Sequence, residues 1–288
     1  MARTVTTDTL RSWLDGGMQA WSLAWNLADV PAGKEDAAVV QVRRTGKGCL
    51  SYVVASGGEA AVIDPSADVE IYVALARRRG WTVTQVIDTH VHADHLSRAR
   101  ALADRTGATV RLPANRRATC AFAPIADGER LCVGGAALTA IATPGHTDES
   151  LSFVLDGLAI FTGDTLFVDG VGRPDLHAAP DAARAKAQAL FRSLSRLRAL
   201  PADLLVLPAH TSAPVPFDGR PVAARLRDIE PWLASWLASE DGFVARVTSQ
   251  LPPTPPNFAR IVALNERGES PEGDPVELEA GANRCAVR

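Results

Sequence analysis

Short runs of apolar and β-branched residues recur along the chain up to residue 207 and predict β-strands. Polar clusters and glycine or proline residues, which are typical of turns, separate these runs. The predicted strands comprise residues 39–42, 50–54, 60–63, 83–87, 110–112, 131–133, 138–141, 151–155, 158–161 and 204–207. The run at 83–87 is short, β-branched and followed directly by polar residues, which indicates a buried strand.

Apolar positions spaced three and four residues apart predict helices between and after the strands. The predicted helices comprise a pattern from residue 69 to Gly80, residues 96–106, residues 180–197, a helical region from 221 onward and a short helix at 258–264. The pattern at 180–197 is the strongest, because its apolar residues all fall on one helical face. Strands and helices that alternate over one long stretch predict a layered αβ architecture.

The composition excludes several classes of protein. The chain has 288 residues, of which 47% are hydrophobic and 22% charged, and a net charge of −3, so disorder and general nucleic-acid binding are disfavoured. No stretch approaches the about 18 apolar residues of a membrane span, and the N-terminal region lacks the pattern of a secretory signal. Four cysteines without a C-x-x-C pair favour buried thiols in the reducing cytoplasm.

Three of the six histidines lie in one short segment, T-H-V-H-A-D-H at 89–95, directly after the buried strand at 83–87. In an extended segment His90, His92 and Asp94 point to the same side, and His95 begins the turn into the next helix. Each buried imidazole would need its own polar partner. Potential ligands clustered this closely therefore predict a metal site and not a packed core.

Three further ligand-type residues follow predicted strands. His146 lies in T-P-G-H-T, Asp164 lies in T-G-D-T, and His210 follows the strand at 204–207. Loops at strand ends can present side chains from a rigid scaffold. If these strands are neighbours in folded sheets, the three side chains converge with the histidine segment at one rim.

H-x-H-x-D-H, then G-H-T, T-G-D-T and a late histidine form a pattern that resembles the metallo-β-lactamase superfamily over roughly residues 38–212. The resemblance implies an α+β fold, the αβ/βα four-layer sandwich, with the metal site at one edge between two sheets. We expect an N-terminal extension (1–37), a catalytic domain (38–220) and a helical C-terminal extension (221–288) packed on the core. The resemblance implies one metal bound by His90, His92 and His146, a second bound by Asp94, His95 and His210, and Asp164 bridging both.

Within the superfamily, F-T-G-D-T-L-F at 161–167 followed by G-R-P-D-L at 172–176 resembles persulfide dioxygenases, the group related to human sulfur dioxygenase. That resemblance implies a single Fe(II) ion bound by His90, His146 and Asp164. The residues that would orient ligands and hold water around it are His92, Asp94, His95 and His210. The implied reaction oxidises glutathione persulfide, or a similar low-molecular-weight persulfide, with O₂ to sulfite and thiol. Two imidazoles and one carboxylate leave open positions on iron for substrate and O₂.

Asp94 and Arg173 are the predicted catalytic residues. Asp94 lies among the ligands, where it would orient them and hold water. Arg173 follows Asp164 in the chain and would hold either the anionic tail of the substrate or the loop itself. The competing interpretation is a structural arginine paired with Asp169 or Asp175.

The main alternative is a dinuclear zinc hydrolase of thioesters similar to glyoxalase II, with two Zn²⁺ ions, because all seven of its ligand positions are occupied here. Glyoxalase II usually continues with aromatic residues after its glycine–arginine pair, so the P-D-L continuation favours the dioxygenase. A metal-binding or sulfur-carrier module without turnover is the alternative outside enzymes. The predicted partners are a small-molecule persulfide or glutathione derivative and O₂, with the chain forming a homodimer in the cytoplasm, without nucleic acid or membrane.

Overall fold

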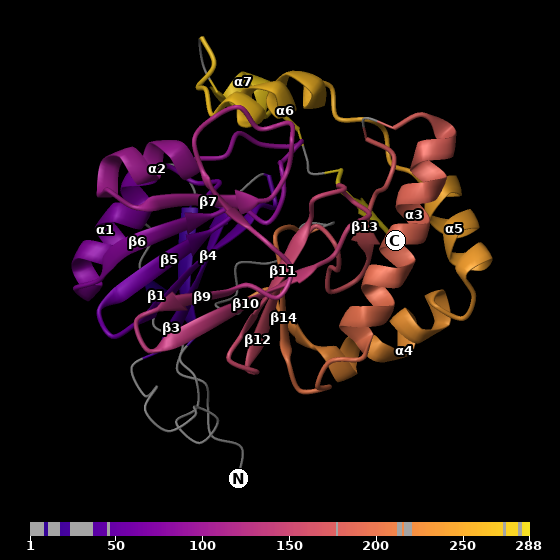
Figure 1. Cartoon of the computed structure of the whole chain (residues 1–288), viewed down its shortest axis with the longest axis horizontal. Helices are drawn as coiled ribbons and strands as arrows, with labels where there is room; N and C mark the ends of the chain where they lie inside the picture. Colours follow the sequence, from indigo (N-terminus) through magenta and orange to yellow (C-terminus); the bar gives the residue numbers. More distant parts are fainter. Residues whose placement is uncertain are drawn as a thin grey trace.

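Two β-sheets lie face to face in the middle of the molecule, and helices cover their outer faces (Figure 1). The computed structural model describes residues 9–10, 18–23, 37–44, 47–176, 178–211, 215, 221–272, 275–281 and 284–288. Most of the predicted N-terminal extension, 1–37, lies outside the described residues. Its boundary at residue 37 therefore stays a prediction.

The first sheet is built from strands that pair in sequence order, from β1 to β8. It comprises β1 (Thr9–Leu10), β2 (Met18–Leu23), β3 (Ala38–Arg44), β4 (Leu50–Ser56), β5 (Glu59–Ile63), β6 (Thr82–Ile87), β7 (Thr109–Pro113) and β8 (Ala123–Ile125). Strands β1 to β5 pair antiparallel, and β5 to β8 pair parallel. Parallel strands need crossover connections. Helix α1 (Val69–Arg79) connects β5 to β6, α2 (Ala99–Thr106) connects β6 to β7, and residues 114–122 connect β7 to β8 without a helix.

The second sheet has the order β15-β14-β12-β11-β10-β9. Its strands are β9 (Arg130–Val133), β10 (Ala136–Ala142), β11 (Leu151–Leu155), β12 (Ala159–Gly163), β14 (Leu205–Pro208) and β15 (Ala224–Arg225). Only the β12–β14 pair is parallel, and α3 (Pro180–Arg198) connects these two strands. A separate two-stranded sheet pairs β13 (Val171–Gly172) with β16 (Ala286–Val287).

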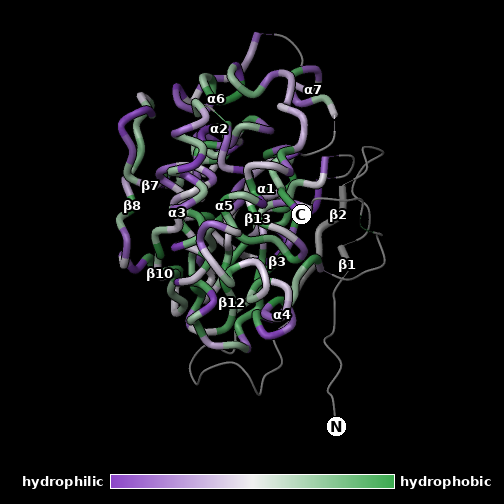
Figure 2. Tube along the Cα trace, turned by 90° about the vertical axis from the view of Figure 1, so that its right-hand side faces the viewer, coloured by the Kyte–Doolittle hydropathy of each residue, from purple (hydrophilic) through white to green (hydrophobic). Residues whose placement is uncertain are grey.

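Side chains alternate between the two faces of a strand, and apolar side chains point to both faces. Both faces of each sheet are therefore covered. In β4, Tyr52 and Val54 belong to the core between the sheets, whereas Val53 belongs to the core under α1 and α2. Phe153 and Phe161 of the second sheet complete the core between the sheets. Figure 2 shows hydrophobic stretches running through the middle of the molecule. The predicted α+β fold, a sandwich of two sheets between two helical layers, is confirmed.

Helices α3, α4 (Leu226–Trp236) and α5 (Glu240–Ser249) cover the outer face of the second sheet. Trp232 and Trp236 pack against this helical layer, with ring centroids 5.5 Å apart. Helices α6 (Phe258–Arg267) and α7 (Pro275–Leu278) supply residues that pack against the histidine segment and against Leu96, which precedes α2. The segment after residue 221 therefore contributes to two different layers, and its boundary at residue 220 stays a prediction.

Helix α2 begins at Ala99, three residues later than predicted from its apolar spacing. The backbone N–H of Leu96 donates to Glu279 and that of Ser97 donates to Asn265, so tertiary contacts hold these residues outside the helix. Within the described ranges, no helix combines the length and apolar character that crossing a membrane requires. The predicted cytoplasmic location and homodimer stay predictions.

Candidate metal centre

The predicted ligands meet at one edge of the sandwich, where strands of both sheets end. Four of them lie in the segment that follows β6 of the first sheet, and the other three follow β10, β12 and β14 of the second sheet. Each is at most 2% exposed: His90, His92, Asp94, His95, His146, Asp164 and His210. The structure thus brings together side chains that lie up to 120 residues apart in the chain.

His90, His146 and Asp164 form the first group of candidate ligands. The Nε2 atoms of His90 and His146 lie 3.8 and 3.6 Å from the same oxygen, Oδ2 of Asp164. None of these three buried atoms has a hydrogen-bond partner among the described residues. A buried polar atom left unpaired costs about 1–3 kcal/mol, so three such atoms facing one another indicate a position for a cation.

The outer nitrogens of the two histidines are held by the surrounding protein. Nδ1 of His90 donates to the Thr89 hydroxyl at 2.9 Å, and that hydroxyl donates to Asp64. Nδ1 of His146 donates to the carbonyl oxygen of Arg173 at 2.8 Å. These bonds fix the tautomer that leaves Nε2 unprotonated. Burial lowers the pKa of both imidazoles, which favours the neutral form that binds metal.

His92 lies between His90 and His95, with ring centroids 4.3 and 4.2 Å away. Its Nε2 lies 3.2 Å from Asp64 and 3.7 Å from Asp88, whereas its Nδ1 is buried without a partner among the described residues. A carboxylate that holds one ring nitrogen while the other binds metal is a common arrangement. His92, Asp64 and Asp88 are also close enough to hold an ion themselves. Because Asp64 already accepts the Thr89 bond, we favour the orienting role for these carboxylates.

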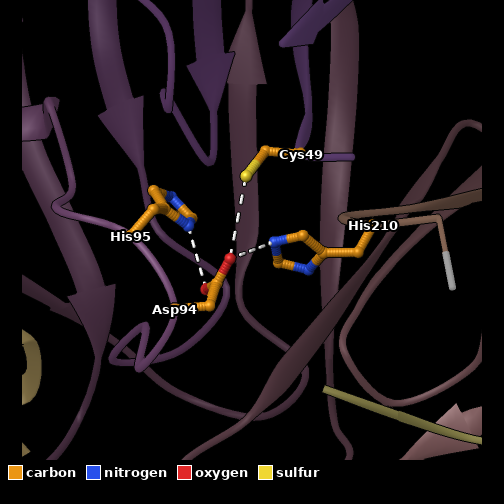
Figure 3. A group of neighbouring side chains, drawn as sticks. All are labelled: Cys49, Asp94, His95 and His210. Atoms are coloured by element: carbon orange, nitrogen blue, oxygen red, sulfur yellow. Dashed lines mark hydrogen bonds and ion pairs between the residues drawn. The ribbon is translucent and has the colours of Figure 1, made fainter. Parts of the chain in front are cut away.

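Cys49, Asp94, His95 and His210 form the second group (Figure 3). Nε2 of His210 lies 2.8 Å from Oδ2 of Asp94, and Nδ1 of His95 lies 3.0 Å from Oδ1. Oδ1 of Asp164 accepts a hydrogen bond from Nδ1 of His210, while its Oδ2 faces the first group. Asp164 therefore touches both groups, as a bridging ligand would.

In the second group, the acidic side chains and the imidazoles each favour the charged form of the other. Burial opposes ionisation of Asp94, yet His210 and His95 hold the pKa of this carboxyl well below its ordinary value. Burial likewise opposes ionisation of Cys49, but His95 and His210 bring the pKa of the thiol below its ordinary value. Burial would lower the pKa of His210, whereas Asp164 and Asp94 raise it. The group thus favours anionic donors beside imidazoles.

Four buried residues of this edge were not predicted from the sequence: Cys49, Asp64, Asp88 and Cys285. Asp64 directly follows β5 and Asp88 directly follows β6. That is the same strand-end position that marks Asp164, so the signal was present in the sequence. Cys49 instead precedes a strand, and only the folded structure brings it to the group.

Arg173 lies beside the metal edge and not in it. Its side chain is buried and donates to both carboxylate oxygens of Asp175 and to the carbonyl oxygens of Pro253 and Arg284. Its own carbonyl oxygen holds His146. This placement favours the role of holding the loop, through Asp175, over contact with the tail of a substrate.

A cavity of about 300 Å³ lies beside His146, between α3 and the histidine segment. Its apolar walls come from Val91, Ala93, Leu176 and Val262, and α3 contributes Ala182, Ala185 and Ala189. The alanines lie three and four residues apart, so one face of α3 leaves room for a ligand. Lys186 of α3 and Arg117 are the basic residues of this cavity.

Comparisons with known proteins agree with this site. A family model of the metallo-beta-lactamase superfamily matches residues 44–120 and 123–210. The chain is 37% identical over 156 residues to the hydroxyacylglutathione hydrolase of Methylococcus capsulatus, covering 53% of this chain and 57% of the relative. It is 35% identical over 188 residues to the hydroxyacylglutathione hydrolase of Rhodospirillum rubrum, covering 60% and 68%. The matched part thus spans little more than half of the first relative and about two thirds of the second.

Among solved structures, the chain is similar to ETHE1 from Myxococcus xanthus. The TM-score is 0.70 with 32% sequence identity, and the match covers 80% of this chain and 98% of that chain.

The predicted activity, persulfide oxidation by a single-iron oxidoreductase, is wrong. Curated relatives that are 35–37% identical are named hydroxyacylglutathione hydrolase, which supports the alternative, a hydrolase. The misleading feature is G-R-P-D-L at 172–176. Arg173 and Asp175 pair with each other, and Arg173 donates to the carbonyl oxygens of Pro253 and Arg284, so these two residues of the motif attach the C-terminal segment.

Proposed function

Because the chain belongs to the metallo-β-lactamase superfamily, we propose that it is a two-metal hydrolase that cleaves thioesters of glutathione. The observation that carries the proposal is the pair of buried ligand groups that share Asp164. The name of the curated relatives supports the substrate class. The reaction adds water to the thioester and yields a carboxylic acid and free glutathione.

We propose that both ligand groups bind zinc. His90, His92 and His146 would hold the first ion, Asp94, His95 and His210 the second, and Asp164 both. Imidazole nitrogens and carboxylate oxygens are usual donors to Zn²⁺. The unpartnered Nε2 atoms of His90, His95 and His146 fit that role. Two bound zinc ions would supply Lewis acidity that polarises the thioester carbonyl and acidifies water.

The protein's own part in this reaction is to hold the metal ligands and the substrate in place. Hydrogen bonds from Asp64 through Thr89 fix His90, and the Arg173 carbonyl fixes His146. The cavity beside His146 would place a ligand within reach of the first group, against apolar walls from α3 and Val262.

Zinc-loaded protein is expected to hydrolyse a hydroxyacyl thioester of glutathione, measured as loss of ultraviolet thioester absorbance. Removing the metal with a chelator should abolish turnover, and adding zinc back should restore it, because the bound ions would supply the Lewis acidity that polarises the carbonyl. Metal analysis should give two zinc ions per chain at full activity.

The same acyl group carried on a thiol without the glutathione carboxylates is the matched substrate control, and it should react more slowly. Zinc-loaded protein that binds two ions yet leaves the glutathione thioester intact would exclude the proposal. Equal rates before and after chelation would exclude the role of the metals.

Lys186 is the proposed contact for a carboxylate of glutathione. Its Nζ donates to the Leu176 carbonyl oxygen at 3.3 Å, which leaves it further donors toward the cavity. Burial lowers the pKa of its ammonium, opposed by the nearby Asp148 and Glu149. A partly buried ammonium beside the apolar wall of the cavity is suited to an anionic ligand.

Lys186→Gln is therefore expected to raise KM for the glutathione thioester by about 10-fold or more with little change in kcat, because a hydrogen bond to a charged group contributes about 1.5–3 kcal/mol. Steady-state kinetics on both thioesters measures this. Arg184→Gln is the matched control, since Arg184 lies on the same helix with its side chain 58% exposed. A fall in kcat at unchanged KM for Lys186→Gln would contradict the assignment.

A further inference from the structure

Cys49 adds a sulfur donor to the second group. The sequence pattern of the other ligands did not predict this residue. Its side chain is buried, and its Sγ lies 3.7 Å from Oδ2 of Asp94. We propose that Cys49 binds the second metal as a thiolate, giving that position sulfur, nitrogen and oxygen donors. The inference rests on the two-metal centre of the proposed function but not on its substrate.

The backbone of Cys49 is fixed at the junction of the two sheets. Cys49 and His210 face each other in an antiparallel bridge, so two donors of the group come from opposite residues of one ladder. On either side of this bridge the N–H of Leu50 donates to Ala209 at 2.7 Å, and the N–H of Thr211 donates to Gly48 at 2.9 Å. The cysteine therefore has little freedom to turn away from the group.

Gly48 allows this close approach of the two chain segments. Its φ is +83°, and a Cβ atom there would lie 2.8 Å from the Thr211 hydroxyl oxygen and 3.1 Å from the Thr211 carbonyl oxygen. A residue with a side chain would separate the segments. Glycine at this position keeps Cys49 beside His210.

The donor atoms of the second group converge on one point. One atom each from Cys49, Asp94, His95 and His210 lies within 4.8 Å of the other three. Figure 3 shows the sulfur, the Asp94 carboxylate and the His210 ring turned toward one another. Nε2 of His95 is buried and has no partner among the described residues. An unsatisfied nitrogen in the same cluster as the thiol points to a shared ligand.

When the Cys49 thiol binds the metal, the sulfur exchanges its proton for the metal ion. The S–H bond breaks, one sulfur–metal bond forms, and one proton leaves to solvent, with no change in oxidation state. Two anionic donors, Asp94 and Cys49, would then offset the charge of the second ion. The first ion would keep three neutral imidazoles and the shared Asp164. The two metals would therefore differ in acidity, and the sulfur would favour zinc or cobalt over magnesium.

Cobalt(II) substitution tests the inference, because a thiolate bound to Co²⁺ gives an intense near-ultraviolet charge-transfer band that nitrogen and oxygen donors lack. We expect the band in protein loaded with two Co²⁺ ions and its loss in Cys49→Ser. The visible ligand-field bands should persist in that variant, which shows that it is folded and still binds cobalt. Affinity for one of the two ions should fall by at least about 10-fold.

Two other cysteines serve as controls for Cys49. Cys132 is exposed, and Cys285 is buried and hydrogen-bonded to Asp164. The band should survive both Cys132→Ser and Cys285→Ser. A band that persists in Cys49→Ser, or that disappears in Cys285→Ser, would overturn the assignment.

X-ray absorption at the zinc edge gives a second measurement that needs no variant. Two bound zinc ions should show one sulfur between them, at about 2.3 Å from the metal, and the absence of sulfur would overturn the inference. None of these measurements involves a thioester. Sulfur ligation without thioester cleavage would therefore reject only the proposed substrate, and cleavage without sulfur ligation would reject only the role of Cys49.

Discussion

Replacing Asp164 with alanine is expected to abolish binding of both metals and to lower kcat/KM for thioester hydrolysis by at least about 10³-fold. One oxygen of Asp164 faces His90 and His146, and the other accepts a hydrogen bond from His210. The substitution therefore removes a donor from both groups at once. Loss of metal Lewis acidity costs several kcal/mol in the transition state, and about 4 kcal/mol corresponds to 10³-fold.

Metal analysis after gel filtration and steady-state kinetics measure the two effects of Asp164→Ala together. Asp169→Ala is the matched control, because Asp169 lies in the same loop, where it pairs with Arg288 and its side chain is 51% exposed. That variant should keep two metals and near-normal turnover. If Asp164→Ala retained both metals, Asp164 would not be the shared ligand.

Replacing Gly172 with alanine is the second change for which we expect a large effect. A Cβ atom at Gly172 would lie 1.9 Å from the carbonyl oxygen of Asp164 and 2.9 Å from Cβ of His146. The backbone of two candidate ligands would have to move. We expect turnover to fall by about 10²-fold, because a shift of about 1 Å in a site has that effect, and the free energy of unfolding to fall by about 1–3 kcal/mol.

Thermal unfolding and thioester kinetics, each with bound zinc measured, check the Gly172→Ala result. Gly242→Ala is the matched control. Gly242 lies in α5, and an added Cβ there meets only the hydroxyl oxygen of Ser239, at 2.8 Å. Alanine is also favoured over glycine inside a helix. Equal effects from the two glycine substitutions would show that close packing against Asp164 is not the cause.

The order of strands and helices follows from local pattern, which is why most of the fold could be predicted from sequence. The strand at 83–87 and the helix at 180–197 correspond closely to β6 and α3. The strand pattern also located the candidate ligands, because each of them follows an apolar strand in the sequence. Residues 96–98 were misassigned to a helix because the partners of Ser97 and Leu96, Asn265 and Glu279, lie 168 and 183 residues away in the chain.

The features that could not be predicted from the sequence depend on contacts between segments that are distant in the chain. The position of Cys49 depends on pairing of Leu50 with Ala209, which no local pattern reports. The role of Arg173 depends on carbonyl oxygens of Pro253 and Arg284. The motif around Arg173 was therefore interpreted as a sign of the reaction. In the structure, Arg173 attaches the C-terminal segment to the loop after Asp164.

Each ligand group takes residues from both halves of the sandwich. The first combines His90, after β6, with His146 and Asp164 from the second sheet, and the second combines Asp94 with His210. A metal ion in either group would act as a cross-link between the two layers, in addition to the hydrogen bonds that join them beside Cys49. Ligation and the assembly of the two halves would thus be one cooperative event, in which part of the ion's binding free energy stabilises the native chain.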